Sequence, residues 1–236
     1  MHTPDCTEQG WGVSIQEGYM PGHEVFGDEE RLAIQELLLA NGGVLSPHGF
    51  DGIRHGIYRV REFEDLVGAF CGSPFAQAVS SGTAALQIAL EALEVGPGDE
   101  VIIPAFTFVA TAEVVVKCGA ELVVVDIDDT FNMCPKALRE SISERTRAVI
   151  VVHMMGAPAA MEEISQIAKE ANICVIEDAA QAFGARYQGQ AVGTIGDIGC
   201  FSFDAGKAIT TGEGGMIVTS DEDLFVRCRV LHDHGH

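Results

Sequence analysis

The sequence has little positive charge: 14 lysine and arginine residues stand against 35 aspartate and glutamate residues, for a formal net charge of -21. This charge repels the phosphate backbone of nucleic acids, and no local cluster of basic residues offsets it, so a nucleic-acid partner is not expected. No apolar run is long enough to cross a bilayer, and no charged-then-apolar leader opens the sequence. We therefore expect a cytoplasmic protein without a membrane partner.

Cysteine pairs of the C-x-x-C type and glycine-rich nucleotide motifs are also absent. The seven cysteines are odd in number and most lie in apolar segments, which indicates reduced thiols of the core rather than disulfides or a zinc site. The terminal histidines His232, His234 and His236 form no closed, buried ligand set, so no metal is predicted. Without a G-x-G-x-x-G or Walker sequence, dinucleotide and nucleoside-triphosphate sites lose their main support.

From Ala76 onward, short β-branched runs alternate with stretches of helical periodicity. The runs are almost continuously hydrophobic, which is typical of parallel strands in a sheet that helices cover on both faces. We expect an α/β fold with about seven strands, over residues 76–80, 101–106, 122–127, 148–155, 174–180, 197–206 and 214–220. Residues 1–19 lack periodicity and are interpreted as a flexible arm, and residues 20–236 as one domain. No cap follows the helical stretch 221–230, which we interpret as a truncation.

Two motifs that follow strands would face a ligand, because open α/β sheets bind ligands at the carboxyl ends of their strands. Residues 80–86 (SSGTAAL) place a turn of small residues before a helix, whose free N–H groups and dipole suit a phosphate. An ordinary Ser/Thr N-cap explains the same pattern. In residues 106–111 (FTFVAT), a phenylalanine ring would stack on a flat cofactor or, as is commoner for phenylalanine, lie in the core.

Two further motifs carry charge. Glu177 and Asp178 follow a buried strand, where carboxylates are costly unless a cation such as a pyridinium nitrogen pairs with them; a solvated strand end is the alternative. Lys207 is the only lysine after Lys169 and lies in a loop of Gly, Ala and Thr between two apolar strands. Desolvation there would favour the neutral amine that a nucleophile needs, whereas a surface lysine is the plain alternative. Ser202 could add a hydroxyl to a phosphate.

In this order, SSGTAAL, PAFTFVAT, EDAAQAFGA, GTIGDIGCFSF and KAITTGEGG resemble the motifs of the DegT/DnrJ/EryC1/StrS family of sugar aminotransferases. The resemblance runs from about Met20 to the last residue. It implies pyridoxal 5'-phosphate (PLP) as cofactor, and the large domain of the fold type I PLP enzymes with the C-terminal small domain absent. Many members have Pro-Thr before the lysine, where this chain has Ala205 and Gly206.

The resemblance also implies a role for each matching residue. Lys207 would bind the cofactor covalently and move a proton of the substrate, and Asp178 would pair with the ring nitrogen. Gln181 would contact the ring hydroxyl, and Phe108 would stack on the ring. Three residues would hold the phosphate: Gly82, Thr83 and Ser202.

The implied reaction transfers an amino group from L-glutamate to a keto-sugar, in a homodimer. Within the family, MPGHEVFG, VHMMG, FSFDAGK and DHGH are most similar to the 8-amino-3,8-dideoxy-manno-octulosonate transaminases. That likeness implies 8-oxo-3-deoxy-manno-octulosonate as substrate and a role in lipopolysaccharide biosynthesis. Two alternatives stay open. A PLP-dependent deoxysugar dehydratase typically replaces the lysine with histidine, so Lys207 argues against it. The other is a catalytically inactive or regulatory fragment, because the small domain is missing.

Overall fold

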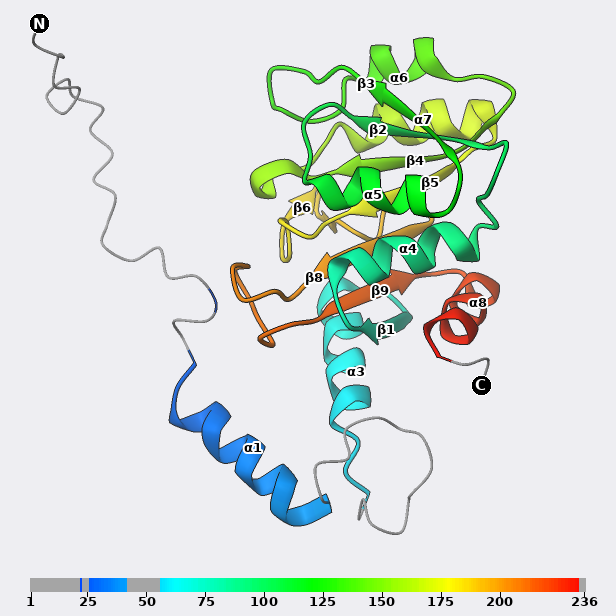
Figure 1. The fold of residues 1–236 in the computed structure, drawn as a ribbon. Coiled ribbons are helices and arrows are strands. Elements are labelled where there is room, and N and C mark those ends of the chain that lie inside the picture. The colour runs from blue at the N-terminus through cyan, green and yellow to red at the C-terminus, as the bar shows by residue number, and fades with distance from the viewer. Residues whose placement is uncertain (1–21, 23–25, 42–55, 234–236) are drawn as a thin grey trace, which may run out of the picture.

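The computed structural model describes residue 22 and residues 26–41 and 56–233 (Figure 1). The arm predicted for residues 1–19 lies outside the described residues, as do most of MPGHEVFG and the end of DHGH. The centre of the fold is a seven-stranded sheet with the spatial order β1-β9-β8-β5-β4-β2-β3. Its strands are β1 (Phe75–Val79), β2 (Glu100–Pro104), β3 (Glu121–Val125), β4 (Thr146–Val152), β5 (Cys174–Asp178), β8 (Ile198–Ser202) and β9 (Gly215–Thr219).

Neighbouring strands are parallel except at β9, which runs antiparallel to both β1 and β8. The predicted α/β fold with about seven mostly parallel strands is confirmed, and each predicted strand overlaps one of those observed. A small hairpin of β6 (Arg186–Tyr187) and β7 (Gln190–Ala191) follows β5 and was not predicted. Two-residue strands carry no periodicity that a sequence pattern could reveal.

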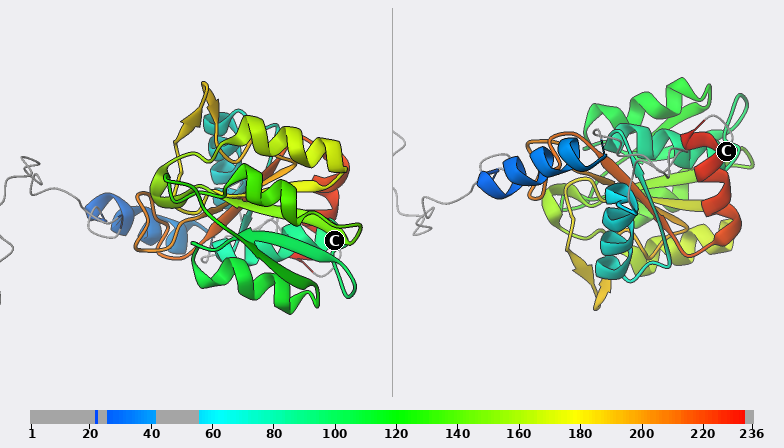
Figure 2. Two further views of the ribbon diagram at one scale, coloured as in Figure 1. Left: turned by 90° about the horizontal axis from the view of Figure 1, so that it is seen from above. Right: turned by 90° about the horizontal axis from the view of Figure 1, so that it is seen from below.

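Helices cover both faces of the sheet (Figure 2). On one face lie α4 (Gly82–Ala92), α5 (Val109–Lys117) and α8 (Glu222–His232), and their apolar side chains form one core cluster with the strands. On the other face lie α3 (Arg59–Cys71), α6 (Pro135–Ser141) and α7 (Met161–Ala171), which enclose two further clusters. Helix α1 (Asp28–Asn41) precedes them in the chain.

The sequence of α7 shows why such helices pack on the sheet. Met161, Ile164 and Ile167 recur at helical spacing, and all three side chains are buried against the sheet. Glu162 lies in the first turn, where the helix dipole favours an acid. Asn172 ends the helix in the left-handed conformation with φ 55°, a geometry that asparagine tolerates. Apolar burial on one side therefore fixes the position of α7, and Asn172 fixes its end.

The carboxyl ends of β1, β2, β4, β5 and β8 lie at the same edge of the sheet, because these strands are parallel to one another. Strand β9 begins at this edge with Gly215, since it runs the other way. A Cβ atom at Gly215 would lie 2.4 Å from the carbonyl oxygen of Ser81, so only glycine lets β9 approach the turn between β1 and α4 so closely. All four motifs found in the sequence therefore reach one edge.

Glu177 and Asp178 point to opposite faces of β5, as successive strand residues must. The Glu177 carboxylate is fully buried and accepts hydrogen bonds from the backbone N–H groups of Gly193, Ile195 and Gly196 at 2.6–2.7 Å. His153, also fully buried, lies 2.9 Å away through Nε2. Its Nδ1 accepts from the N–H of Ala159, so the proton lies on Nε2 and a neutral imidazole donates to Glu177. Glu177 therefore ties the segment before β8 to β5 and β4.

We predict that Glu177→Gln lowers the free energy of unfolding by about 2–3 kcal/mol, because an amide donor would face the N–H groups that the carboxylate now accepts. Urea denaturation measures the change. The matched control is Glu113→Gln on the exposed side of α5, which we expect to stay within about 0.5 kcal/mol of the parent chain. Equal stability of the two variants would contradict this role for Glu177.

Candidate active site

Three predicted site residues line one pocket of about 370 Å³ at the carboxyl edge of the sheet. Gln181 comes from the segment after β5, Ser202 from the end of β8, and Lys207 from the loop between β8 and β9. Phe183 and Ile209 add apolar walls. The pocket therefore combines an amine, a hydroxyl and an amide with apolar surface, a composition suited to a small polar ligand with a flat ring.

Asp178 lies beside this pocket and is 5% exposed at the end of β5. Its Oδ1 accepts from the N–H of Ala180 at 3.2 Å, and its Oδ2 accepts from the hydroxyl of Thr111 at 3.0 Å. Burial raises the pKa of the Asp178 carboxyl, while these two hydrogen bonds and the charge of Lys207 act to lower it. Each oxygen keeps a lone pair for a further donor, so the site can accept a cation next to Lys207.

The loop that carries Lys207 is tied down at its base. Phe203 donates its N–H to the carbonyl of Gly214, and the Phe203 carbonyl accepts from the N–H of Thr211 and the hydroxyl of Thr210. The N–H of Lys207 donates to the carbonyl of Asp204 at 3.0 Å. Lys207 itself is half-buried. These bonds hold the lysine between two sheet strands, with Ala205 and Gly206 in front of it.

The backbone of Met155 orients Gln181. Met155 adopts φ 54°, a left-handed conformation that is uncommon for residues other than glycine, in the 3-10 turn η2 (Met154–Gly156) after β4. Its N–H donates to Gln181 Oε1 at 3.0 Å. Because the amide oxygen is engaged, the Nε2 group is the part of Gln181 suited to bind a ligand, and it can only donate.

The turn from β1 to α4 has the form of an anion site. Ser81 is the N-cap residue and accepts from the N–H of Ala84 at 3.0 Å, so the ordinary capping role is present. The N–H groups of Gly82 and Thr83 belong to the first turn of α4, where the helix offers them no acceptor. A Cβ atom at Gly82 would lie 2.8 Å from the Cβ of Ser202, so glycine lets the helix start approach the end of β8. Gly82 therefore lies next to Ser202, and Thr83 follows it in the same first turn of α4.

Phe108 is not a core residue. Its side chain is 64% exposed at the N-cap of α5, after the carboxyl end of β2. Phe106 is the other phenylalanine of the motif, and its ring centroid lies 5.7 Å from that of Phe131. Phe108 is not among the residues that line the Lys207 pocket. It stands one helical turn before Thr111, which contacts Asp178, so a flat ligand on Asp178 would lie near this segment.

Two residues of the site were not predicted. Thr111 is fully buried and bonds to Asp178, and Met155 orients Gln181. Thr111 stood inside the FTFVAT motif, four residues after Thr107, a spacing that places both on one side of a helix start. That spacing was a usable signal. The backbone conformation of Met155 has no counterpart in the sequence pattern.

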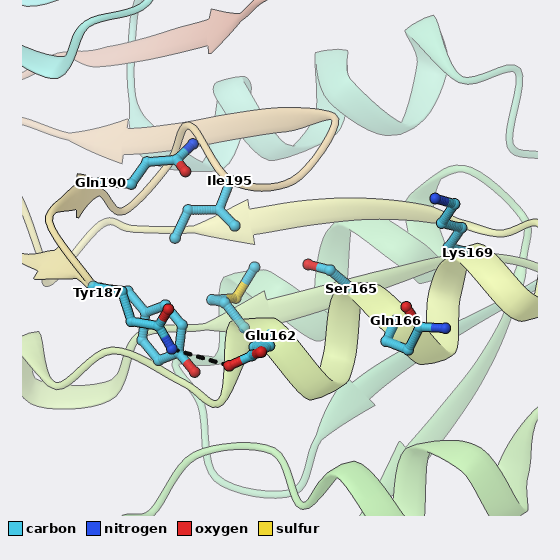
Figure 3. A pocket seen from close by; sticks show the side chains of 9 residues that line it. Glu162, Ser165, Gln166, Lys169, Tyr187, Gln190 and Ile195 are labelled. Carbon is cyan, nitrogen blue, oxygen red and sulfur yellow. Dashed lines mark hydrogen bonds between the residues drawn. The ribbon is translucent and has the colours of Figure 1, made fainter.

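A second depression, of about 400 Å³, lies between α7 and the β6–β7 hairpin (Figure 3). Two of its polar side chains pair within the protein: Gln188 donates to Glu162 at 3.0 Å, and Gln190 donates to the carbonyl of Thr194 at 2.8 Å. None of the predicted site residues lines it. The chemistry therefore gathers at the carboxyl edge of the sheet and not at this hollow.

The described part of the chain holds neither a metal-binding cluster nor a membrane-spanning helix. Among residues 22, 26–41 and 56–233, no group of three or more His, Cys, Asp and Glu side chains is arranged to hold a metal ion. The last two of the terminal histidines lie outside this range. No helix that the structure describes has both the length and the apolarity to span a membrane.

Comparison with known proteins identifies the family. The profile of the DegT/DnrJ/EryC1/StrS aminotransferase family matches residues 52–236, and the chain belongs to this family. GDP-perosamine synthase of Caulobacter vibrioides is 47% identical over 175 residues, which cover 74% of this chain and 47% of that protein. UDP-N-acetyl-3-dehydro-alpha-D-glucosamine 3-aminotransferase of Acidithiobacillus ferrooxidans is 49% identical over 177 residues, which cover 74% and 48%. The chain thus spans about half the length of the curated relatives it matches.

Solved structures agree in fold. The aminotransferase from Psychrobacter cryohalolentis superposes with a TM-score of 0.80 at 39% identity, over 87% of this chain and 50% of that one. A protein of Streptococcus pneumoniae described as a sugar aminotransferase has a TM-score of 0.79 at 30% identity in its PLP form, over 87% and 55%. The enzymes of this family depend on PLP, as the motifs implied.

The residues at the carboxyl edge fit that cofactor. A buried carboxylate with lone pairs to spare suits a protonated ring nitrogen, and first-turn N–H groups beside a serine hydroxyl suit a phosphate. Lys207 faces the same pocket as Gln181 and Ser202. Asp178, Gln181, Ser202 and Lys207 thus offer chemistry that suits the cofactor, whereas Phe108 lies outside the pocket lining.

We predict that Asp178→Asn stabilises the cofactor-free chain at pH 8 by about 1–2 kcal/mol, because a neutral amide removes the penalty of a buried charge. The folded pKa of Asp178 is raised, so its contribution to stability is complete below the unfolded pKa and is lost as pH rises through the folded pKa. The gain should therefore shrink toward pH 4. Thermal unfolding at both pH values measures it, and a gain that does not depend on pH would contradict the argument.

Proposed function

We propose that this chain is the cofactor-binding part of a PLP-dependent aminotransferase that moves an amino group from L-glutamate to a keto-sugar. One observation carries the proposal: Lys207, Ser202 and Gln181 line a single pocket, and Asp178 is buried beside it. The charge of Lys207 acts to lower the pKa of Asp178. Membership of an aminotransferase family supports the reaction class.

Each residue then has a definite task. Bound PLP supplies an electron sink for the carbon atom that loses a proton during amino transfer. Asp178 holds a positive charge on the ring nitrogen, and Gln181 donates its Nε2–H to the ring oxygen. Lys207 binds the cofactor through Nζ and afterwards uses the same nitrogen to accept and return the proton of the substrate. Phe108 covers one face of the ring, and the phosphate is held by Gly82, Thr83 and Ser202.

The substrate class follows from the relatives, and the individual sugar is a narrower proposal. The relatives named above include a GDP-perosamine synthase and an aminotransferase of a UDP-linked 3-dehydro-glucosamine, which supports a keto-sugar as amino acceptor. The MPGHEVFG, VHMMG and DHGH segments favour 8-oxo-3-deoxy-manno-octulosonate, with a role in lipopolysaccharide biosynthesis. The family resemblance also favours a cytoplasmic homodimer.

A regulatory or inactive fragment is the second candidate. A relative from Geobacillus stearothermophilus, 45% identical over 178 residues, bears the name pleiotropic regulatory protein. This candidate shares the cofactor pocket and differs only in catalysis. A deoxysugar dehydratase is disfavoured because a lysine, and not a histidine, stands at position 207.

We predict that incubation with PLP followed by borohydride reduction leaves a pyridoxyl group on Lys207, located by peptide mass spectrometry. Lys207→Ala should lose the label. Lys169→Ala, which removes an exposed lysine on α7, should keep it at the parent level. Label that persists in Lys207→Ala would refute the assigned lysine, and an unlabelled parent chain would refute the proposed function.

Amino transfer distinguishes the two candidates. The PLP-loaded chain, given L-glutamate in a single turnover, should release 2-oxoglutarate and change its absorption spectrum, whereas D-glutamate should leave it unchanged. A chain that binds PLP on Lys207 and leaves L-glutamate intact would favour the regulatory or inactive fragment. Assays with 8-oxo-3-deoxy-manno-octulosonate and with nucleotide-linked keto-sugars then separate the acceptors.

A further inference from the structure

Thr111 contacts Asp178, which lies in another part of the chain. It lies in the first turn of α5 and is fully buried. So close to the start of α5, its hydroxyl has no carbonyl one turn earlier in the same helix to bond to. This hydroxyl instead donates to Oδ2 of Asp178, 67 positions further along the chain, at 3.0 Å. The bond therefore serves the carboxylate and not the helix.

A second threonine, Thr107, extends this hydrogen bond into a chain. The hydroxyl oxygens of Thr107 and Thr111 lie 2.7 Å apart. Because Thr111 gives its proton to Asp178, its oxygen is free to accept, and Thr107 becomes the donor. The result is a directed chain from Thr107 through Thr111 to Asp178, in which each bond polarises the next.

The second oxygen of Asp178 is held by the backbone. Its Oδ1 accepts the N–H of Ala180 at 3.2 Å, so Thr111 is the side-chain donor on the other oxygen. With both oxygens fixed, the carboxylate plane cannot turn freely, and the remaining lone pairs keep one direction. Such an arrangement suits a single N–H donor of a bound ring more than a mobile counterion.

We propose that Thr111 is the positioning residue for Asp178: its hydroxyl keeps the carboxylate ionised and turned toward the ring nitrogen of the cofactor, and Thr107 holds that hydroxyl in place. This role rests on the proposed function, because it needs a ring nitrogen at Asp178. Phe108 lies between the two threonines in the same segment. The start of α5 would thus act on the ring in two ways: Phe108 would cover its face, and Thr111 would position Asp178 at its nitrogen.

The charges around Asp178 give the proposal a pH dependence. Burial raises the pKa of the carboxyl, while the Thr111 hydroxyl and the charge of Lys207, in the loop after β8, act to lower it. His153, at the end of β4, is neutral and bonds to Glu177 on the other face of β5. Cys200 on the neighbouring β8 is a buried thiol whose own pKa is raised well above its usual range, so it stays neutral. Loss of the Thr111 hydroxyl should therefore raise the pKa of Asp178. At a given pH, a smaller fraction of the Asp178 carboxyl groups would then be ionised.

The test uses pyridoxamine phosphate, which carries the same ring nitrogen and phosphate as PLP but cannot condense with Lys207. Its dissociation constant is measured by titration between pH 5 and pH 9 for the parent chain, Thr111→Val and Thr111→Ser. We expect Thr111→Val to bind about tenfold more weakly near neutral pH, the usual effect of losing a hydrogen bond to a charged group. The pH at which the affinity for pyridoxamine phosphate rises should also be higher in Thr111→Val than in the parent chain. Thr111→Ser keeps the hydroxyl, so it should restore both the affinity and this pH.

Thr146→Val is the matched control. Thr146 is a buried threonine whose hydroxyl also donates to a carboxylate, Oε2 of Glu100 at 3.3 Å, at the opposite edge of the sheet. The Thr146→Val variant should lower the thermal stability of the cofactor-free chain about as much as Thr111→Val does. It should leave the affinity for pyridoxamine phosphate and the pH profile of that affinity unchanged. A role of Thr111 in stability alone predicts the same behaviour for both variants.

The outcomes separate the two proposals. If the parent chain binds pyridoxamine phosphate and Thr111→Val binds it with the same affinity and the same pH profile, the positioning role is wrong and the proposed function stands. If the parent chain binds neither PLP nor pyridoxamine phosphate, the proposed function fails, and the role of Thr111 fails with it. Weaker binding by Thr111→Val with restoration by Thr111→Ser supports the proposal.

Discussion

A buried carboxylate is stable only if donors or a cation replace the water it has lost, and the end of β5 buries two carboxylates in succession. The alternation of side chains along a strand sends them to opposite faces. Glu177 finds three backbone N–H groups and His153, which fill its oxygens and hold the segment before β8 in place. Asp178 finds two donors and keeps a lone pair on each oxygen for a further donor, within reach of the charge of Lys207. Of these two adjacent acids, Glu177 therefore has a structural role, and Asp178 keeps lone pairs for a ligand.

The reversed direction of β9 brings the lysine to this acid. Parallel neighbours need a long crossover connection, but β8 and β9 are antiparallel, so the loop of residues 203–214 starts and ends at the same edge of the sheet. Its base is closed by hydrogen bonds on Phe203. Lys207 therefore sits in a loop anchored at both ends, opposite the ends of β1 and β5. The same reversal places Gly215 against Ser81, which joins the β1–α4 turn to the site.

The sequence carried most of the architecture. Continuous apolar runs such as 148–152 were sufficient to predict central parallel strands, and the strand-end motifs all reach one edge of the sheet, where the candidate site was expected. The β6–β7 hairpin, the role of Glu177 and the turn at Met155 were missed, because each depends on where backbone N–H groups point after folding. The strand pattern alone did not distinguish the two acids, and only the family resemblance singled out Asp178. The pleat of β5 shows that their side chains lie on opposite faces of the sheet.

The position of β1 has a consequence for how the chain assembles. Among the strands that the structure describes, this edge strand pairs only with β9, from Phe75–Thr219 to Val79–Gly215. The Ser73 hydroxyl also bonds to the Thr219 carbonyl across 146 positions. Contacts this distant close late, because a long loop must lose its freedom before they form. During synthesis, β1 and the turn that follows it must wait for nearly the whole described domain to emerge. The sheet between β3 and β8 can form first, and the ligand edge is completed last.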